Sequence, residues 1–133
     1  MNDVVIDASA LVLVIGGHEA AADDLRERLP ALRRHAPHLI DAEVVNVLRR
    51  HESAGLMSTA ECVTGLAALP SLIDHRYPHT AGGLAETAWQ LRDSLSFYDA
   101  LYVALAAHLG TPLLTADARL VRAPGLPCRV ELV

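Results

Sequence analysis

Acidic residues beside short apolar segments are the side chains of this sequence best placed to do chemistry. Asp7 follows the β-branched run 4–6 in "VVIDASALV", and Asp99 opens the nearly all-apolar stretch "SFYDALYVALA". A helix that is apolar all round is buried on most sides, and a buried carboxylate is costly unless it is paired or binds a cation. Ser96 precedes Asp99 at the spacing of an N-terminal capping box. A helix cap and a functional site are therefore both open for Asp99.

Two more acids stand in the same kind of position. Glu43 lies in "DAEVVNVLRR", where we expect a helix from about Ala42, and Asp117 follows the apolar run "PLLT" by two residues. Short apolar strands that alternate with helices indicate a parallel sheet. The carboxyl ends of parallel strands share the edge where such folds bind ligands. Capping explains any one of these acids, whereas four acids on one edge predict a site.

The elements that must position these acids follow from apolar periodicity, glycines and caps. The predicted strands are 4–6, 38–40, part of 73–80, 112–115 and 128–132. The predicted helices begin after residue 7 and cover about 18–29, 42–54, 58–70, 81–95, 96–106 and 117–123. No linker, repeat or low-complexity segment divides the chain. Residues 1–133 are therefore expected to form one α/β domain with a mainly parallel sheet.

Composition disfavours several functions. The net charge of −5 argues against a protein that coats nucleic acid through bulk electrostatics. All 11 basic side chains are arginines, and haloacid-dehalogenase-like phosphatases and response-regulator receivers both use a lysine. Ser9 also stands where those phosphatases carry a second aspartate, and the chain has neither a GxGxxG motif nor a P-loop. The arginine pairs 33–34 and 49–50 are expected on solvated helix faces.

Cysteine usage and the N-terminal run bear on location. Cys62 and Cys128 are far apart and lack metal-ligand spacing, so neither a disulfide framework nor a zinc site is expected. The apolar N-terminal run is short, contains Asp7 and lacks a basic leader. We therefore expect neither a signal peptide nor a membrane span, and a cytoplasmic protein.

Four carboxylates close together repel one another, and a divalent cation removes that conflict. Oxygen ligands without cysteine or an organised histidine pair select a hard ion, Mg²⁺ or Mn²⁺. Because Mg²⁺ prefers few carboxylates plus substrate phosphate, the set points to phosphodiester chemistry. The seven histidines are scattered and none lies inside an acidic motif. A metal-activated water is therefore a simpler mechanism than a histidine base.

Four segments together resemble the signature of the PIN-domain nucleases, and most closely the VapC type of bacterial toxin: "VVIDASALV", "DAEVVNVLRR", "SFYDALYVALA" and "LLTADARL". The resemblance covers essentially the whole chain, with the motifs in the family's order. It implies a compact three-layer α/β/α sandwich and an endoribonuclease that depends on Mg²⁺ or Mn²⁺. It also implies a homodimer and a small VapB-type antitoxin that neutralises the enzyme.

The resemblance assigns roles to individual residues. The residues that match the family's acidic quartet, as catalytic residues and metal ligands, are Asp7, Glu43, Asp99 and Asp117. Thr115 matches a hydroxyl that supports the ligands, with a helix cap equally open. Ser9 and Asn46 match commonly polar positions, as caps or orienting hydrogen-bond partners. Arg92 is a weak candidate for contacting RNA phosphate, with a plain helix surface as the alternative.

Two other functions stay open. A PIN fold kept as a binding module without catalysis would be expected to lose acids, and here all four positions are filled. A housekeeping RNA-processing or DNA-cleaving nuclease would keep the chemistry without an antitoxin. For a toxin, we expect a groove that takes single-stranded or looped RNA, and an antitoxin segment that places a basic side chain near the quartet. The helices between residues 42 and 72 offer apolar residues for a dimer interface.

Overall fold

The computed structural model describes residues 2–133 and contains a five-stranded sheet in which all neighbouring strands are parallel. The strands are β1 (Asn2–Ile6), β2 (Leu32–Pro37), β3 (His75–Tyr77), β4 (Leu113–Thr115) and β5 (Val130–Leu132), in the order β3-β2-β1-β4-β5. The chain builds outward from β1 to β2 and β3, and then returns to β4 on the other side of β1. Such a reversal of strand order is where open α/β sheets bind ligands.

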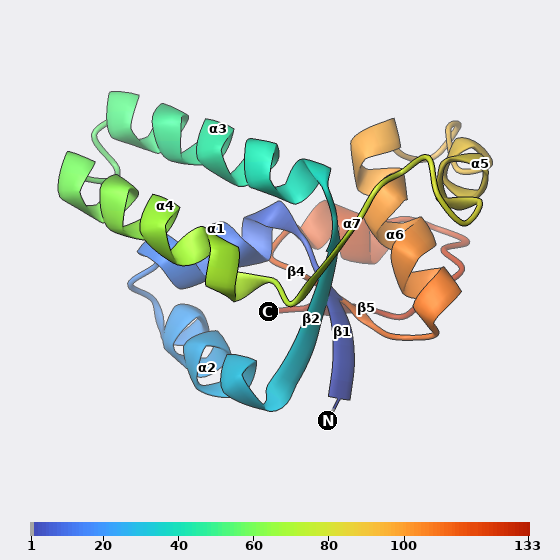
Figure 1. Cartoon of the computed structure of the whole chain (residues 1–133), viewed down its shortest axis with the longest axis horizontal. Coiled ribbons are helices and arrows are strands. Elements are labelled where there is room, and N and C mark those ends of the chain that lie inside the picture. The colour runs from blue at the N-terminus through green and yellow to red at the C-terminus, as the bar shows by residue number, and fades with distance from the viewer. Residues whose placement is uncertain (1) are drawn as a thin grey trace.

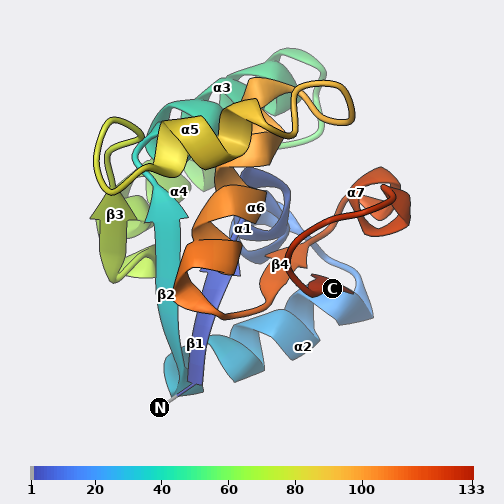
Figure 2. The ribbon, with the colours of Figure 1, turned by 90° about the vertical axis from the view of Figure 1, so that its right-hand side faces the viewer.

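Helices cover both faces of the sheet. The helices are α1 (Ala8–Gly16), α2 (Ala20–Arg28), α3 (Leu39–Ser53), α4 (Thr59–Leu72), α5 (Leu84–Trp89), α6 (Phe97–Leu109) and α7 (Ala118–Arg122), with a 3₁₀ turn η1 (Leu29–Ala31). Figure 1 shows α1 to α4 on one side of the sheet and α5 and α6 on the other, and Figure 2 shows β1 and β2 edge to edge. The predicted α/β/α sandwich around a parallel sheet is confirmed.

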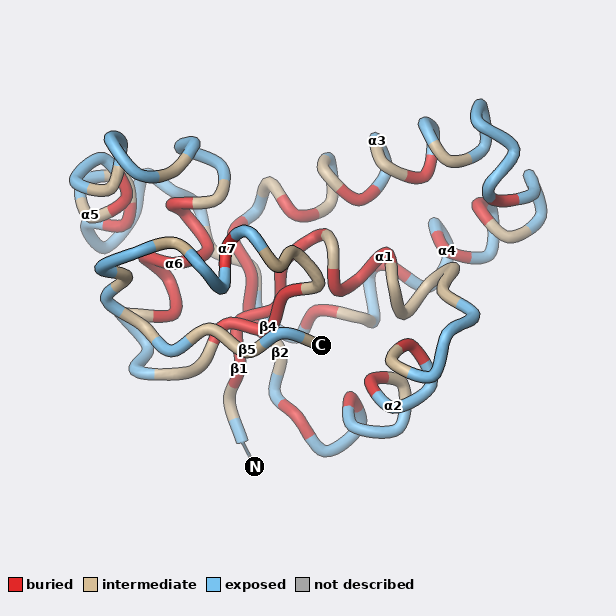
Figure 3. The backbone as a smooth tube through the Cα atoms, turned by 180° about the vertical axis from the view of Figure 1, so that it is seen from behind, coloured by how far each residue is buried: buried red, intermediate tan, exposed pale blue. Residues whose placement is uncertain are grey.

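The surroundings of α6 explain why its sequence is apolar all round. Its residues 100–106 are all buried, and Figure 3 shows the burial continuing through β1 and β4. The sheet strands β1, β2 and β4 pack on one side of α6 and α5 packs on another. Burial of this apolar surface drives the packing. Because α6 runs opposite to the strands, its N-terminus lies at their carboxyl edge.

The second strand differs from the prediction. The pattern predicts a strand at 38–40 and a helix from Ala42, whereas β2 ends at Pro37 and α3 begins at Leu39. Glu43 consequently lies in the second turn of α3 rather than the first. The pair 33–34 lies in β2, so its prediction as a helix face is wrong; the pair 49–50 is exposed on α3 as expected.

Distant partners explain how a strand forms from the polar sequence of β2. The backbone N–H of Arg34 donates to Oδ2 of Asp74 at 2.8 Å. His35 is buried, with 6% of the residue exposed. Its Nε2 lies 2.7 Å from Oδ1 of Asp3, and its Nδ1 lies 2.8 Å from the hydroxyl of Tyr77. These partners come from β1, β3 and the turn before β3, so local periodicity does not reveal the strand.

The helix boundaries predicted from local sequence agree better with the structure than the predicted position of β2 does. Ser58 and Glu61 form the predicted capping box at the start of α4. The helix continues through Pro70 to Leu72, two residues beyond the predicted end. The predicted strands around β3, β4 and β5 are confirmed within a few residues. Among residues 2–133, no helix combines the length and apolar character needed to cross a membrane.

Candidate active site

All four predicted acids line one pocket of about 450 Å³ at the carboxyl edge of the sheet. Asp7 follows β1 and caps α1, and Glu43 projects from α3. Asp99 lies in the first turn of α6, and Asp117 caps α7. Four segments far apart in sequence therefore bring a carboxylate to the place where β1 and β4 adjoin. We call this space the acidic pocket.

Asp7 is the most completely held of the four acids and is 8% exposed. Its Oδ1 accepts hydrogen bonds from Oγ of Ser9 at 2.6 Å and from the backbone N–H of Ala10 at 3.0 Å. Its Oδ2 accepts from Oγ1 of Thr115 at 2.5 Å. Burial is the main influence on the Asp7 carboxyl and raises its pKa. The hydrogen bonds lower the pKa and the charge of Asp99 raises it further, so the pKa remains above its usual value.

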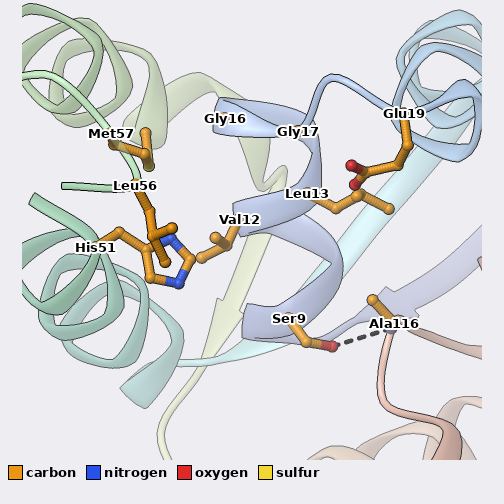
Figure 4. Close-up of a pocket in the computed structure, with 10 residues that line it drawn as sticks. All are labelled: Ser9, Val12, Leu13, Gly16, Gly17, Glu19, His51, Leu56, Met57 and Ala116. Atoms are coloured by element: carbon orange, nitrogen blue, oxygen red, sulfur yellow. Dashed lines mark hydrogen bonds between the residues drawn. The ribbon is translucent and has the colours of Figure 1, made fainter. Parts of the chain in front are cut away.

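Ser9 and Thr115 also tie Asp7 to the segment that carries Asp117. Oγ1 of Thr115 accepts from the backbone N–H of Asp117 at 3.0 Å, and Oγ of Ser9 accepts from the backbone N–H of Ala116 at 2.9 Å (Figure 4). The two hydroxyl oxygens are 3.3 Å apart. Both side chains thus lie where hydrogen-bond support for the acids is predicted, and they fix Asp7 relative to the start of α7.

Glu43 is held by a tyrosine from α6. The hydroxyl of Tyr102 donates to Oε1 of Glu43 at 2.6 Å. Burial raises the pKa of Glu43, the hydrogen bond from Tyr102 lowers it, and the charges of Asp99 and Asp7 raise it. Burial and the adjacent carboxylate raise the pKa of Tyr102, so its hydroxyl stays protonated and remains a donor.

Asp99 combines a capping position with a place in the pocket. Oγ of Ser96 accepts from the backbone N–H of Asp99 at 3.2 Å, so Ser96 caps α6. The residue also lines the acidic pocket. Burial raises the pKa of Asp99 and the charge of Asp117 adds to the rise, while Ser96 and Arg119 oppose it. The cap therefore explains the backbone of Asp99 but not the position of its carboxylate.

Asp117 faces a counter-charge within its own helix. Nε of Arg119 lies 3.2 Å from Oδ1 of Asp117, and Nη2 lies 3.1 Å from Oδ2. The backbone N–H of Arg119 also donates to Oδ1 at 2.9 Å. The bonds from the guanidinium hold the pKa of Asp117 below its usual value. Asp117 is thus the acid of the pocket that already has a cationic partner.

The four carboxylates are the kind of ligand that a hard cation prefers, although they do not converge on a single metal position. Burial is the largest cause of the raised pKa values of Asp7, Glu43 and Asp99, and neighbouring carboxylates add to each. Within residues 2–133, no group of three or more His, Cys, Asp or Glu side chains is close enough to hold a metal ion as it stands. Side-chain bonds from Tyr102 and Arg119 already engage two of the acids. The pocket therefore concentrates oxygen donors, and of its four carboxylates Asp117 is the one paired with a cation.

Comparison with known proteins agrees with this geometry. The sequence model of the PIN-domain family matches residues 4–126. The chain is 50% identical over 133 residues to Ribonuclease VapC1 of Mycobacterium tuberculosis, covering 100% of this chain and 99% of the relative. The chain belongs to the PIN-domain family, among the VapC ribonucleases.

Solved PIN-domain structures share the fold. VapBC2 of Rickettsia felis, bound to a DNA fragment from the promoter, gives a TM-score of 0.70 at 14% identity and covers 98% of each chain. The sarcin–ricin-loop-cleaving toxin VapC20 of M. tuberculosis gives 0.68 at 18% identity, with 95% of this chain and 98% of that chain covered. These similarities confirm the predicted fold.

Two predicted site residues of this PIN domain lie elsewhere. Asn46 is exposed on α3, where its Oδ1 accepts from Nη2 of Arg49 at 3.2 Å, and it does not line the acidic pocket. Arg92 is exposed, with its guanidinium carbon 5.0 Å from the ring centroid of Trp89, and it is also absent from the pocket lining. Helix periodicity alone does not determine which face meets a pocket built by other segments.

Four side chains with polar groups line the acidic pocket although the sequence did not predict them as site residues. They are Arg50, His51, Tyr102 and Arg119. Spacing gives a signal for three of them: residues 50 and 51 follow Glu43 by seven and eight positions, which is one helix face, and Tyr102 follows Asp99 by three. The same reasoning brings a histidine next to the acids, which the scattered sequence positions did not suggest.

Proposed function

We propose that this chain is a Mg²⁺- or Mn²⁺-dependent endoribonuclease that hydrolyses RNA phosphodiester bonds and acts as the toxin of a VapBC-type pair. The observation that carries the proposal is the convergence of four carboxylates, from four separate segments, on one pocket of a VapC-family PIN fold. A PIN fold kept only as a binding module has no need of this convergence, because four adjacent carboxylates raise the free energy of the folded chain.

In this proposal the four acids bind a divalent cation together. The proposed ligands are Asp7, Glu43, Asp99 and Asp117. A bound Mg²⁺ or Mn²⁺ would supply Lewis acidity that makes water nucleophilic and stabilises charge developing on the phosphoryl group. Ser9 and Thr115 orient Asp7, and Tyr102 orients Glu43, through the hydrogen bonds described above.

The basic residues beside the acids give the substrate a place to bind. Arg50 and Arg119 line the same pocket as the carboxylates, and both are exposed. A guanidinium can contact RNA phosphates by charge-assisted hydrogen bonds. The small domain offers no device for opening a duplex, so single-stranded or looped RNA is the substrate class.

The partners follow from the same family membership. A VapB-type antitoxin would lay a segment across the acidic pocket and place a basic side chain near the carboxylates, whose charge attracts an arginine as well as a metal. Exposed apolar residues on α3 and α4, Val45, Val63 and Leu66, support a homodimer. We further propose a single PIN domain over residues 1–133 that acts in the cytoplasm, where RNA substrates occur.

The decisive experiment is cleavage of a labelled total-RNA pool by the wild-type chain and by Asp99→Asn, each with EDTA, Mg²⁺ or Mn²⁺. We expect metal-dependent cleavage by the wild type and its loss in the variant. Asp93→Asn is the matched control, because Asp93 is exposed and lies outside the acidic pocket. A folded wild-type chain that leaves every RNA intact in all metals, or an Asp99→Asn variant that cleaves as well as Asp93→Asn, would contradict the proposal.

A second measurement separates a toxin from a housekeeping nuclease. Coexpression with the product of the small reading frame next to the gene should give a stable complex that no longer cleaves the RNA pool. A complex that leaves the acidic pocket open while still blocking cleavage would contradict the proposed position of the antitoxin segment. A gene without such a neighbour would favour the housekeeping enzyme.

A further inference from the structure

A second, mainly apolar pocket adjoins the acidic pocket. Its volume is about 280 Å³, and it lies between α1, the start of α2 and the turn after α3. The apolar walls are Val12 and Leu13 of α1 on one side and Leu56 and Met57 of the turn on the other (Figure 4). We call it the Leu56 pocket. Leu56 is 69% exposed, so its apolar side chain is accessible to a ligand that enters the pocket.

The two pockets are continuous. Three residues, Ser9, Val12 and His51, line both. Ser9 is also the residue whose hydroxyl donates to Asp7 at 2.6 Å. A group entering the Leu56 pocket therefore lies directly beside whatever the acids hold.

The turn that forms the pocket is held by its own backbone. The carbonyl oxygen of His51 accepts from the backbone N–H of Leu56 at 2.8 Å and from that of Met57 at 3.3 Å. In Figure 4 the His51 ring and Leu56 lie opposite Val12. A planar imidazole and a leucine side chain thus form one wall before any ligand arrives.

Polar groups complete the pocket. Glu19 lines it, and the hydrogen bonds found among residues 2–133 engage neither the Glu19 carboxylate nor the imidazole of His51. Both side chains are therefore free to bond a polar edge of a ligand. A nucleobase stacks on a ring or apolar wall and offers polar edges to neighbouring groups. A carboxylate accepts from exocyclic amino groups, which adenine, cytosine and guanine carry and uracil lacks.

We propose that the Leu56 pocket binds one unpaired RNA base of a nucleotide next to the phosphodiester held at the acidic pocket, with His51 and Leu56 as the stacking wall and Glu19 as the acceptor. This rests on the proposed ribonuclease function. It predicts a preference at that position for a base with an exocyclic amino group.

The test measures binding rather than cleavage. A short single-stranded RNA carrying one 2-aminopurine, placed at successive positions, is titrated with Asp99→Asn in Mg²⁺. Because 2-aminopurine fluorescence falls when the base stacks, we expect quenching at one register of the series. Adding Leu56→Asn should reduce that quenching and weaken binding about tenfold, because a polar side chain no longer packs against the face of the base. Leu56 is exposed, so this change leaves the core intact.

Two further variants make the test specific. Leu109→Asn is the matched control, because Leu109 is an exposed leucine at the end of α6, at the opposite edge of the sheet. It should bind the RNA like its parent. The Glu19→Gln variant should bind the RNA with a smaller preference for amino-bearing bases over uracil, since an amide both donates and accepts hydrogen bonds.

The outcomes are distinguishable. RNA binding that is the same in the Leu56→Asn and Leu109→Asn variants, or quenching at no position, would overturn the base-binding pocket while leaving the ribonuclease proposal intact. Binding without quenching, together with displacement of the RNA by an apolar antitoxin peptide, would assign the pocket to the antitoxin instead. Failure of the parent to bind any RNA would overturn both proposals.

Discussion

Two nitrogens of Arg119 bind the two carboxylate oxygens of Asp117, with Nε 3.2 Å from Oδ1 and Nη2 3.1 Å from Oδ2. The Arg119 side chain is 85% exposed, so it is free to move away from the pocket. Asp117 is one of the four proposed metal ligands, and its partner is already a cation of the same chain. Arg119 therefore competes with a metal ion for the carboxylate of Asp117, and it can also contact an incoming phosphate.

Replacing Arg119 tests the competition. We expect Arg119→Gln to bind Mn²⁺ several-fold more tightly than wild type in the absence of RNA, because the guanidinium repels the metal and its bonds to Asp117 must break before that carboxylate turns to a metal. Electron paramagnetic resonance of free Mn²⁺ during titration measures this directly. Arg92→Gln, on an exposed arginine outside the pocket, should have no effect. Weaker binding by Arg119→Gln would mean instead that Arg119 orients Asp117 for the metal.

The hydroxyl of Thr115 has a measurable role. Thr115→Val removes the 2.5 Å hydrogen bond to the buried carboxylate of Asp7 and leaves that oxygen less satisfied. We expect the free energy of unfolding to fall by about 1–3 kcal/mol, as measured by urea denaturation in EDTA. The same change at Thr111 is the control, because its buried Oγ1 has no hydrogen-bond partner in the described part of the chain. Thr111→Val should be neutral or slightly stabilising; equal losses in both variants would contradict the role assigned to Thr115.

The acids should make stability depend on pH and on metal. The raised pKa values of Asp7, Glu43 and Asp99 mean that the folded chain binds more protons than the unfolded chain as the pH rises above the usual aspartate value of 3.8. The free energy of unfolding contributed by these groups therefore falls from about pH 4 toward neutral pH. Asp99→Asn removes one repelling charge, so its melting temperature in EDTA should exceed that of the wild type at neutral pH.

The same measurement has two internal controls. Near pH 4 the difference between Asp99→Asn and wild type should shrink, because the wild-type carboxyl groups become protonated there. Mg²⁺ at neutral pH should raise the melting temperature of the wild type more than that of the variant, since a ligand that binds the folded state stabilises it. Identical melting temperatures of the two chains in EDTA at both pH values would contradict the raised pKa values.

Arg26 stabilises the far end of the helix that carries Ser9. Its Nε donates to the carbonyl oxygen of Val14 at 2.8 Å and its Nη2 donates to that of Gly17 at 2.5 Å. The last carbonyl groups of a helix otherwise lack partners. We expect Arg26→Gln to lower the free energy of unfolding by about 1–2 kcal/mol, as measured in urea. Arg49→Gln, which loses only two exposed bonds to Asn46, should change it little.

Local chemistry could be predicted from the sequence. Ser58 and Glu61 lie three residues apart and form the capping box that this spacing predicts, because both partners belong to one turn. The acids at the ends of β1 and β4 and at the start of α6 were found for a related reason. In a parallel sheet the direction of the strands alone brings these positions to one edge.

Interactions between distant segments could not be predicted in this way. The polar pair Arg34 and His35 forms part of a strand only because Asp74, Asp3 and Tyr77 supply partners from elsewhere. Arg26 and Arg76 show the same limit: Arg26 donates to carbonyl oxygens at the end of α1, and Arg76 pairs with Asp41 and donates to a carbonyl oxygen of α4, and none of these partners follows from local periodicity.

The sequence by itself determined which acids can meet, since a residue's place at a strand end or helix start follows from short-range periodicity and caps. Only the tertiary structure decided what surrounds them. The orientation of α3 brings His51 into the acidic pocket and leaves Asn46 outside, and the turn after α3 adds Leu56 beside it. The physical reason is that a helix face is selected by the surfaces against which it packs, and those surfaces come from residues far away in the chain.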